Sequence, residues 1–351
     1  MDSLIAAAVA FLASFISIFF VLIFTRRFGL YDPVDSRKVH TGNVPRLGGV
    51  GIFLGFVVGL LVYTILREGT TGFRVWGLIV GSALVFVMGV WDDLLPWRAR
   101  IKLLVQIAAA LIVIFAGYVF HTLRIVGLGV PFNLGWAGYL ITFCWIIGVT
   151  NAVNLIDGID GLAGVVSLIA ALTIAYIFRL NGNIDAIMYC VILALSIGGF
   201  LVYNLPIPKA KLFMGDGGSQ FLGFTLAVLP LIPGKDGFVG VNVLFAAAIL
   251  IIPLFDTVAA LWRRTREGRS FLEPDKFHLH HKLMMMGFSA RQSLVILASF
   301  QTLLSLLVLV ASRTRGLTAL ITLVSVYILG ILFFTVIHVR KEEILEKSKL
   351  L

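Results

Sequence analysis

The chain has 351 residues, of which 60% are hydrophobic and only 13% are charged, and its mean hydropathy is +1.03. This composition excludes an ordinary soluble domain and is typical of an all-α, polytopic membrane protein. The formal net charge of +10 comes from basic residues scattered over short loops, which argues against nucleic acid and favours anionic membrane lipids and phosphorylated substrates as partners.

Eleven apolar segments reach or approach the length that crosses a bilayer, and we expect the whole chain, 1–351, to form one transmembrane domain from them. Their approximate limits are 4–25, 47–66, 73–91, 103–120, 136–153, 162–178, 186–204, 219–232, 239–260, 293–311 and 317–338. The eighth has 14 residues, fewer than the roughly 17–25 that a spanning helix needs, so it is either re-entrant or begins earlier.

The distribution of Lys and Arg predicts how these segments are oriented. With the N-terminus outside and the C-terminus in the cytoplasm, 21 of the 28 Lys and Arg residues fall on the inner side. The positive-inside bias therefore favours this topology. Residues 121–135 then lie outside, and their glycine and β-branched residues predict a short hairpin or surface loop. Cys144 and Cys190 fall within apolar segments and are expected to be small buried residues.

Two groups of polar residues follow the first and third segments. Lys38, His40 and Arg46 lie in a loop broken by glycine and proline, and they would either bind phosphate or anchor the loop to lipid headgroups. Asp92 and Asp93 end the third segment at a membrane boundary. Adjacent carboxylates repel each other unless a cation lies near them, so this pair indicates a cation site.

The connection between the fifth and sixth segments carries the densest set of polar side chains. Asn151, Asn154, Asp157 and Asp160 recur every three residues and would share one helical face if the helix continues through Gly158. Acids and amides at the end of a membrane helix are costly to bury, which favours a functional site. The alternative is a polar loop in which these residues cap the next helix.

Asp216 lies between glycines just before the eighth segment. Its carboxylate is a hard oxygen ligand of the kind that Mg²⁺ prefers, and the N–H groups that follow form an anion cradle at a helix start. The pattern is short, and an aspartate here also serves as a helix cap. Phe213, three residues earlier, would either stack on a nucleotide base or pack in the core.

The longest inner loop contains His278, His280 and His281. A zinc site is disfavoured because the loop has no cysteine and the H-x-H-H spacing is unusual for tetrahedral coordination. Phosphate binding or proton handling suits histidines that lie beside Lys276 and Lys282 better.

All these groups fall on the inner side of a topology chosen from Lys and Arg alone, which predicts one cytoplasmic pocket. The loops expected to form it are 26–46, 92–102, 154–161, 205–218 and 261–292. Carboxylates and amides without thiolates favour Mg²⁺ or Mn²⁺. Basic loops around such an ion favour phosphate-bearing substrates, and a pocket open to both bilayer and cytosol would let a lipid phosphate meet a soluble nucleotide.

Five motifs in this order resemble those of the polyprenyl-phosphate N-acetylhexosamine-1-phosphate transferases. They are Arg37-Lys38-x-His40 with Pro45-Arg46-x-Gly48-Gly49, Asp92-Asp93, Asn151-Ala-x-Asn154-x-x-Asp157-Gly-x-Asp160-Gly-Leu-Ala163, Phe213-Met-Gly-Asp216-x-Gly-Ser219 and His278-Leu-His-His281. The match spans residues 37 to 281, and its Asn151–Ala163 portion is the most specific. The His-Leu-His-His form resembles the branch that uses UDP-N-acetylglucosamine (UDP-GlcNAc).

The resemblance implies a role for each matching position. Asn154 and Asp216 would bind Mg²⁺ with the UDP-sugar diphosphate, and Asp92 or Asp93 would orient or deprotonate the lipid phosphate. Phe213 would stack on uracil and Asp160 would bind its edge. Asp157 would support the ligands or be structural. The predicted catalytic residues are Asp92, Asp93, His280 and His281, and the predicted substrate-binding residues are Lys38, Arg46, Asn151, Asp157, Asp160, Phe213 and His278.

The resemblance further implies an enzyme of the bacterial inner membrane that transfers GlcNAc-1-phosphate from UDP-GlcNAc to undecaprenyl phosphate and releases UMP, the first membrane step of an envelope glycan. We expect the lipid phosphate to attack the sugar-linked phosphorus directly; an aspartyl-phosphate intermediate is the alternative. Other UDP-N-acetylhexosamines or UDP-MurNAc-pentapeptide are alternative donors. A secondary transporter is the non-enzyme alternative, although the acids lie at helix ends and no repeat is visible. Abundant small residues in the spans are compatible with a homodimer.

Overall fold

The computed structural model describes residues 2–29, 44–67, 72–126, 131–207, 209–233, 240–268 and 277–349. Lys38 and His40 therefore lie outside the described residues. The elements of the described part are α1 (Asp2–Phe28), α2 (Gly49–Leu66), α3 (Phe73–Leu94), α4 (Ala99–Phe115), β1 (Thr122–Arg124), β2 (Pro131–Asn133), α5 (Trp136–Ile156), α6 (Leu162–Leu180), α7 (Ile184–Asn204), α8 (Gly215–Val228), the 3₁₀ helix η1 (Leu229–Leu231), α9 (Val243–Ile249), α10 (Ile251–Arg266), α11 (Leu279–Met285), α12 (Ala290–Arg313) and α13 (Gly316–Lys349).

Within these residues, eight helices are long and apolar enough to cross a membrane, and the bent pair α9 and α10 makes a ninth if it forms one span. The prediction of an all-α, polytopic membrane protein is confirmed. The predicted count of eleven spans is not confirmed, because it included two shorter helices, α4 with 17 residues and α8 with 14.

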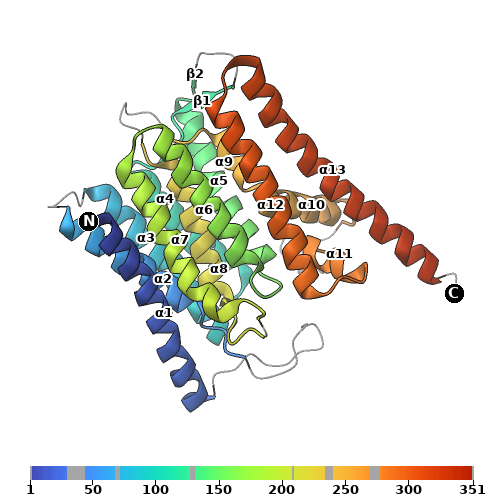
Figure 1. The fold of residues 1–351 in the computed structure, drawn as a ribbon, viewed down its shortest axis with the longest axis horizontal. Coiled ribbons are helices and arrows are strands. Elements are labelled where there is room, and N and C mark those ends of the chain that lie inside the picture. Colours follow the sequence, from blue (N-terminus) through green and yellow to red (C-terminus); the bar gives the residue numbers. More distant parts are fainter. Residues whose placement is uncertain are drawn as a thin grey trace.

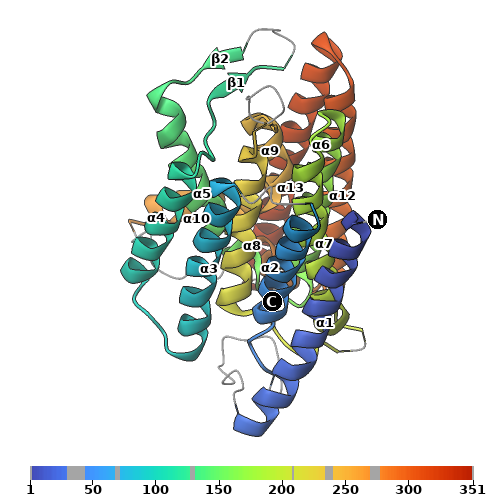
Figure 2. The ribbon, with the colours of Figure 1, turned by 90° about the vertical axis from the view of Figure 1, so that its left-hand side faces the viewer.

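The short helix α8 is enclosed by protein along its length. Every residue from 217 to 228 is buried, and α3, α5, α2 and α6 all pack against it. A helix that is apolar and buried all round is a core element, so its length need not match the thickness of a bilayer. Figure 2 shows α8 in the interior of the bundle, with α3 and α2 beside it.

The segment predicted as the ninth span is broken in the middle. Helices α9 and α10 meet at an angle of 84°. Pro253 lies in the first turn of α10, where it has no N–H for the carbonyl of Ile249 four residues earlier, and its ring would clash there in a continuous helix. The Gln301 side chain instead donates to the Ile249 carbonyl oxygen at 2.9 Å. The break therefore has a defined cause and a satisfied backbone.

The remaining helices surround this core. Helix α1 packs on α2 and α7, α6 packs on α7 and α12, and α12 packs on α13. Helices α1 and α13 lie on opposite sides of the bundle (Figure 1). The hairpin predicted near 121–135 is confirmed: β1 and β2 are antiparallel, with Leu123 opposite Phe132.

Candidate functional site

Three of the predicted site residues meet where α3 and α5 end and α8 begins. The Lys102 ammonium, from the first turn of α4, forms ion pairs with the carboxylates of Asp92 and Asp216, the latter at 3.1 Å. The Asn154 side chain donates to Asp216 Oδ1 at 3.4 Å. Residues 62 to 124 positions apart along the chain are thus joined in one polar cluster, as the sequence predicted.

The two adjacent acids Asp92 and Asp93 have different surroundings. Asp93 accepts the backbone N–H groups of Asp216 at 2.9 Å and Gly217 at 3.0 Å, one on each carboxylate oxygen. It therefore caps the N-terminus of α8 from a neighbouring helix, where a carboxylate is favoured by the helix dipole. Asp92 accepts the N–H of Trp97 at 2.7 Å and the Lys102 ammonium. Asp93 therefore has the contacts of a structural helix cap, whereas Asp92 forms an ion pair with a lysine side chain.

The two loops that carry Arg46 and Phe213 are bonded to each other through their backbones. Phe213 N–H donates to Pro45 O at 2.8 Å, and Gly48 N–H donates to Phe213 O at 2.9 Å. Gly49 allows α2 to approach α8, because a Cβ at this position would lie 2.3 Å from the backbone of Gly218. The half-buried Phe213 and Arg46 are thereby held beside Asp216.

A buried amide network lies one helical turn inside the cluster. The side chain of Gln106 donates to Gln220 Oε1 at 3.0 Å and accepts from Asn151 Nδ2 at 2.8 Å. Asn151, predicted to bind substrate, is therefore bonded to Gln106 on α4 and, within its own helix, to Ile147 O at 2.8 Å. Gln106 was not predicted, although it follows Lys102 by one turn on α4, and that spacing would have placed both on one face.

The residues from Asn151 to Asp160 do not form the continuous helical face that was predicted, and the connection 157–161 between α5 and α6 is called the Asn–Asp connection below. Helix α5 ends at Ile156, Asp157 is its C-cap residue, and α6 begins only at Leu162. The backbone leaves the helical region at Asp157, with φ −77° and ψ +56°, and Gly161, with a φ of +80°, is the N-cap residue of α6. Only Asn151 and Asn154 share a helix, and the two aspartates lie in the connection.

The connection nevertheless belongs to the same electrostatic site. Burial, together with the nearby carboxylates of Asp216, Asp93 and Asp160, raises the pKa of Asp157 to about 8. Asn204, which sequence reasoning missed, ties this connection to the Asp216 loop: it accepts Gly161 N–H and donates to Leu212 O, both at 2.9 Å.

The histidine loop packs against this connection. The imidazole of His280 is 2% exposed, and a Cβ on Gly158 would lie 2.0 Å from its Nε2. Neither ring nitrogen of His280 has a hydrogen-bond partner among the described residues. Burial, with His281 and His278 nearby, lowers the pKa of His280 well below its usual value, because the charged form is disfavoured there. A neutral imidazole thus faces the Asn–Asp connection.

The donor chemistry of the cluster fits a hard divalent cation. Asp92, Asp216 and the Asn154 amide supply oxygen atoms, the ligands that Mg²⁺ and Mn²⁺ prefer. Burial is the main cause of the raised pKa of Asp157, and the nearby carboxylates add negative charge that a cation would offset. Lys102 supplies part of that positive charge. In the described part of the chain, no three His, Cys, Asp or Glu side chains are grouped so that they could hold a metal ion.

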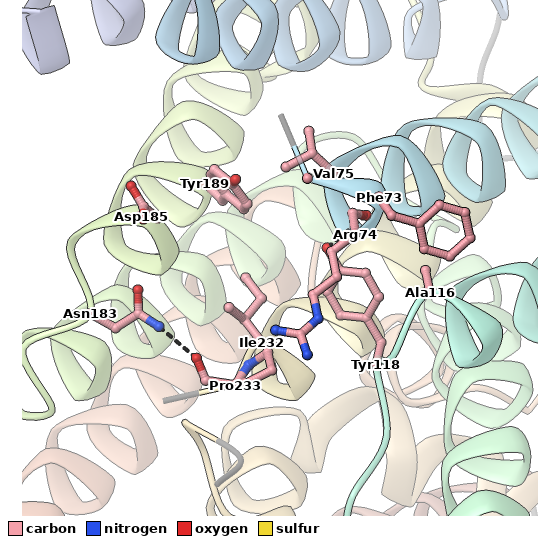
Figure 3. A pocket seen from close by; sticks show the side chains of 11 residues that line it. Phe73, Arg74, Val75, Ala116, Tyr118, Asn183, Asp185, Tyr189, Ile232 and Pro233 are labelled. Carbon is pink, nitrogen blue, oxygen red and sulfur yellow. Dashed lines mark hydrogen bonds between the residues drawn. The ribbon is translucent and has the colours of Figure 1, made fainter. Parts of the chain in front are cut away.

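A cavity of about 510 Å³ lies at the other ends of α3 and α7 and contains none of the predicted site residues. Figure 3 shows Arg74 and Tyr118 on one wall, and Asp185 and Tyr189 from α7 on the other. Its polar groups are largely engaged already. Asp185 accepts from Tyr63 at 2.7 Å and pairs with Arg67. The polar cluster lies at the opposite end of α3 from this cavity, because Asp92 is near the end of that helix and Phe73, Arg74 and Val75 are at its start.

Comparison with known proteins agrees with the site. The family model described as glycosyl transferase family 4 matches residues 75–234. A probable undecaprenyl-phosphate N-acetylglucosaminyl 1-phosphate transferase of Bacillus subtilis (strain 168) is 34% identical over 300 residues, 84% of this chain and 82% of the relative. Undecaprenyl-phosphate alpha-N-acetylglucosaminyl 1-phosphate transferases of Escherichia coli (strain K12) and Pasteurella multocida are 30% and 33% identical, each over 84% of this chain and over 80% and 82% of the relatives. The chain belongs to glycosyl transferase family 4, among the undecaprenyl-phosphate N-acetylglucosaminyl 1-phosphate transferases.

Proposed function

We propose that the protein transfers GlcNAc-1-phosphate from UDP-GlcNAc to undecaprenyl phosphate, releasing UMP and forming undecaprenyl-diphosphate-GlcNAc. The observation that carries this proposal is the meeting of Asp92, Asn154 and Asp216 around the Lys102 ammonium. The names of the relatives supply the two substrates. Such a cluster suits a reaction in which two phosphorylated, negatively charged molecules must be brought together.

We assign Asn154 and Asp216 as ligands of Mg²⁺, with Mn²⁺ as the alternative ion. When bound, the ion neutralises charge on the phosphates. Phe213 and Asp160 are assigned to the uracil, and Arg46, with Lys38 outside the described residues, to the phosphates. Asp157, buried beside the cluster in the connection after α5, is assigned a supporting role. Asn151 is assigned to the substrate site together with Gln106, to which its side chain is bonded.

The reaction forms one P–O bond and breaks another. An oxygen of the lipid phosphate attacks the sugar-linked phosphorus, and the bond to the UMP phosphate oxygen breaks, so that UMP leaves with the electron pair. A phosphate monoester is largely dianionic at neutral pH, and the fraction that carries a proton gives it to Asp92. Asp93 holds α8 in place, while Lys102, the neutral imidazole of His280 and the ring of His281 stabilise developing charge.

We further propose eleven membrane-crossing or membrane-embedded segments, an external N-terminus and a cytoplasmic C-terminus. The five loops 26–46, 92–102, 154–161, 205–218 and 261–292 then form the site on the cytoplasmic face of the bacterial inner membrane. The Lys and Arg distribution supports this orientation. It also places a water-soluble nucleotide sugar and the headgroup of a lipid at the same surface.

The direct test uses detergent-solubilised protein, Mg²⁺, undecaprenyl phosphate and a panel of labelled UDP-sugars. We expect a chloroform-soluble labelled product with UDP-GlcNAc, together with stoichiometric UMP. A product with only another UDP-N-acetylhexosamine, or with UDP-MurNAc-pentapeptide, would change the donor but keep the chemistry. Well-folded protein that forms no lipid product with any donor, but moves a solute across vesicles, would establish a transporter instead.

The same material tests the one-step route. Direct attack requires lipid phosphate before the UDP-sugar bond breaks, so no exchange of labelled UMP into UDP-GlcNAc is expected without lipid. Exchange in the complete absence of undecaprenyl phosphate would contradict direct attack and indicate a covalent aspartyl-phosphate intermediate.

Asparagine substitutions should separate the adjacent acids. Asp92→Asn is expected to lower kcat about 100-fold or more with only a small loss of thermal stability, because asparagine still accepts the Trp97 N–H and Lys102 keeps its ion pair with Asp216. Asp93→Asn should lower thermal stability as well, because it loses a charge-assisted cap on α8 worth roughly 1–2 kcal/mol. Kinetics and thermal unfolding of both variants, measured side by side, check this. Equal stabilities would contradict the structural role of Asp93.

Gly158→Ala should displace His280. The added Cβ would lie 2.0 Å from Nε2, and the ring is confined by His278 and His281 on either side. Because a misplacement of about 1 Å costs on the order of 100-fold in rate, we expect a loss of that size. Gly148→Ala, in α5 and with nothing within 4 Å of the added carbon, is the control. Wild-type kcat in Gly158→Ala would show that His280 is not needed in this position.

A further inference from the structure

Asp256 is a buried acid that no predicted motif contains. It lies on α10, just beyond the Pro253 break, and its side chain is 1% exposed. An isolated buried carboxylate is strongly destabilising, so it is retained only where partners satisfy it. Its two oxygens have two partners, and both belong to the histidine loop.

The first partner is the ring of His278, whose Nδ1 lies 2.9 Å from Asp256 Oδ2. A carboxylate can only accept, so Nδ1 carries the hydrogen in this bond. In neutral His278 this leaves the lone pair on Nε2. The tautomer and the plane of the His278 ring are therefore set by Asp256.

The second partner is the backbone of α11. Leu279 N–H donates to Asp256 Oδ1 at 2.9 Å. His278, the N-cap residue of α11, makes no side-chain cap of its own. Asp256 thus takes the place of an N-cap from another helix. A helix of seven residues has little stability alone, so such outside contacts decide where α11 lies.

The fixed ring begins a row of histidines. The His278 and His280 rings are nearly parallel, with centroids 6.1 Å apart, and the His280 and His281 centroids are 4.2 Å apart. His280 in turn lies directly against Gly158 in the connection that carries Asp157 and Asp160. A change in the position of His278 would therefore shift the His280 ring that lies against this connection.

We propose that Asp256 is a positioning residue for the transfer reaction. Its carboxylate fixes the tautomer of His278 and the first turn of α11, and thereby holds His280 against the Asn–Asp connection. This inference rests on the proposed function, and Asp256 acts through His278 without touching substrate.

The test compares Asp256→Asn with Thr257→Val. Asparagine keeps the shape and one acceptor for Leu279 N–H but loses the charge that selects the His278 tautomer. Outer partners that orient a functional histidine are typically worth about 10- to 100-fold, and we expect a fall in kcat of that size, with a smaller change in KM for UDP-GlcNAc. Thr257 is the next residue on α10, and its hydroxyl donates only within the helix, to Pro253 O. Thr257→Val should keep wild-type kcat.

Two further measurements separate positioning from a merely structural role. In a double-mutant cycle, Asp256→Asn combined with His278→Asn should be no slower than the slower single variant, because both act through one ring. The ¹⁵N spectrum of histidine-labelled wild-type protein should show one ring held as the Nδ1–H tautomer, and Asp256→Asn should abolish that signal. If Asp256→Asn yields no folded protein, His278→Asn, which leaves Asp256 its bond to Leu279 N–H, replaces it in the rate comparison and should show the same fall in kcat, and its spectrum shows which signal belongs to His278.

Additive effects in the cycle, wild-type kcat in Asp256→Asn, or an unchanged tautomer signal would each overturn the proposal. Failure of the proposed function is distinguishable, because it shows as a wild-type protein without lipid product. The ¹⁵N comparison needs no turnover, and in that case it alone decides whether Asp256 orients His278.

Discussion

Asp216→Asn is expected to lower the rate of UMP release by roughly a thousandfold or more, the largest effect of any single side-chain replacement in this protein. Asp216 is the member of the cluster with the most charged and polar partners. It is bonded to Lys102 and Asn154 through its side chain, and its backbone N–H donates to Asp93. Replacing one carboxylate oxygen by an NH₂ group turns a cation ligand into a donor that faces an ammonium.

The fold should survive this replacement. The bond from Asp216 N–H to Asp93 does not involve the side chain, so α8 keeps its cap. Asparagine also has nearly the shape of aspartate. We therefore expect near-normal thermal unfolding and a large loss of kcat at every Mg²⁺ concentration tested.

Asp185→Asn is the matched control, because Asp185 is an acid paired with a base, Arg67, at the far end of α7. Its kcat should stay within about twofold of wild type, since a half-exposed ion pair contributes little. The measurement is UMP release with undecaprenyl phosphate and UDP-GlcNAc. Asp216→Asn with more than a tenth of the wild-type rate would remove Asp216 from the metal assignment.

The sequence was sufficient to predict which acids meet, and the reason is topological. The Lys and Arg distribution predicts that Asp92, Asn154 and Asp216 each lie at the inner end of a segment, so a common surface was the expected placement. The ion pairs of Lys102 with Asp92 and Asp216, and the bond from Asn154 to Asp216, agree with this. The hairpin could likewise be predicted, because its signal is local.

Features that depend on long-range packing could not be predicted in this way. Hydropathy measures how apolar a segment is, not whether lipid or protein surrounds it, so the enclosed α8 was counted as a span. The three-residue spacing from Asn151 to Asp160 suggested one helical face, but α5 ends at Ile156, before either aspartate. Asp256 and Asn204 resemble ordinary polar residues in sequence, and only the tertiary structure brings Asp256 to His278 and Asn204 to Gly161.

Gly215→Ala should have the second large effect, through the backbone at the start of α8. Gly215 has a φ of +76°, which costs a residue with a Cβ about 1–2 kcal/mol. Gly29 has a similar φ of +66° but nothing within 4 Å of an added Cβ. Gly29→Ala therefore carries the conformational cost alone and is the matched control.

At Gly215 the added carbon would also lie 2.1 Å from Arg46 O and 2.5 Å from Asp93 Oδ2. Neither atom can retreat cheaply. The Arg46 carbonyl belongs to the loop held by the bonds of Pro45 and Gly48 to Phe213, and the Asp93 carboxylate caps α8. The clash must therefore move the loop that carries Asp216 or release its cap.

We expect activity per folded protein to fall at least about 100-fold in Gly215→Ala, because a shift near 1 Å in the cluster suffices for a loss of that size. In Gly29→Ala it should stay within about twofold. The midpoint temperature of thermal unfolding should drop in both variants. It should drop more in Gly215→Ala, because only there does a steric clash add to the conformational cost of the backbone. Equal unfolding midpoints with unchanged activity would mean that α8 can begin without this contact, and that the joined loops of Arg46 and Phe213 do not hold Asp216 in position.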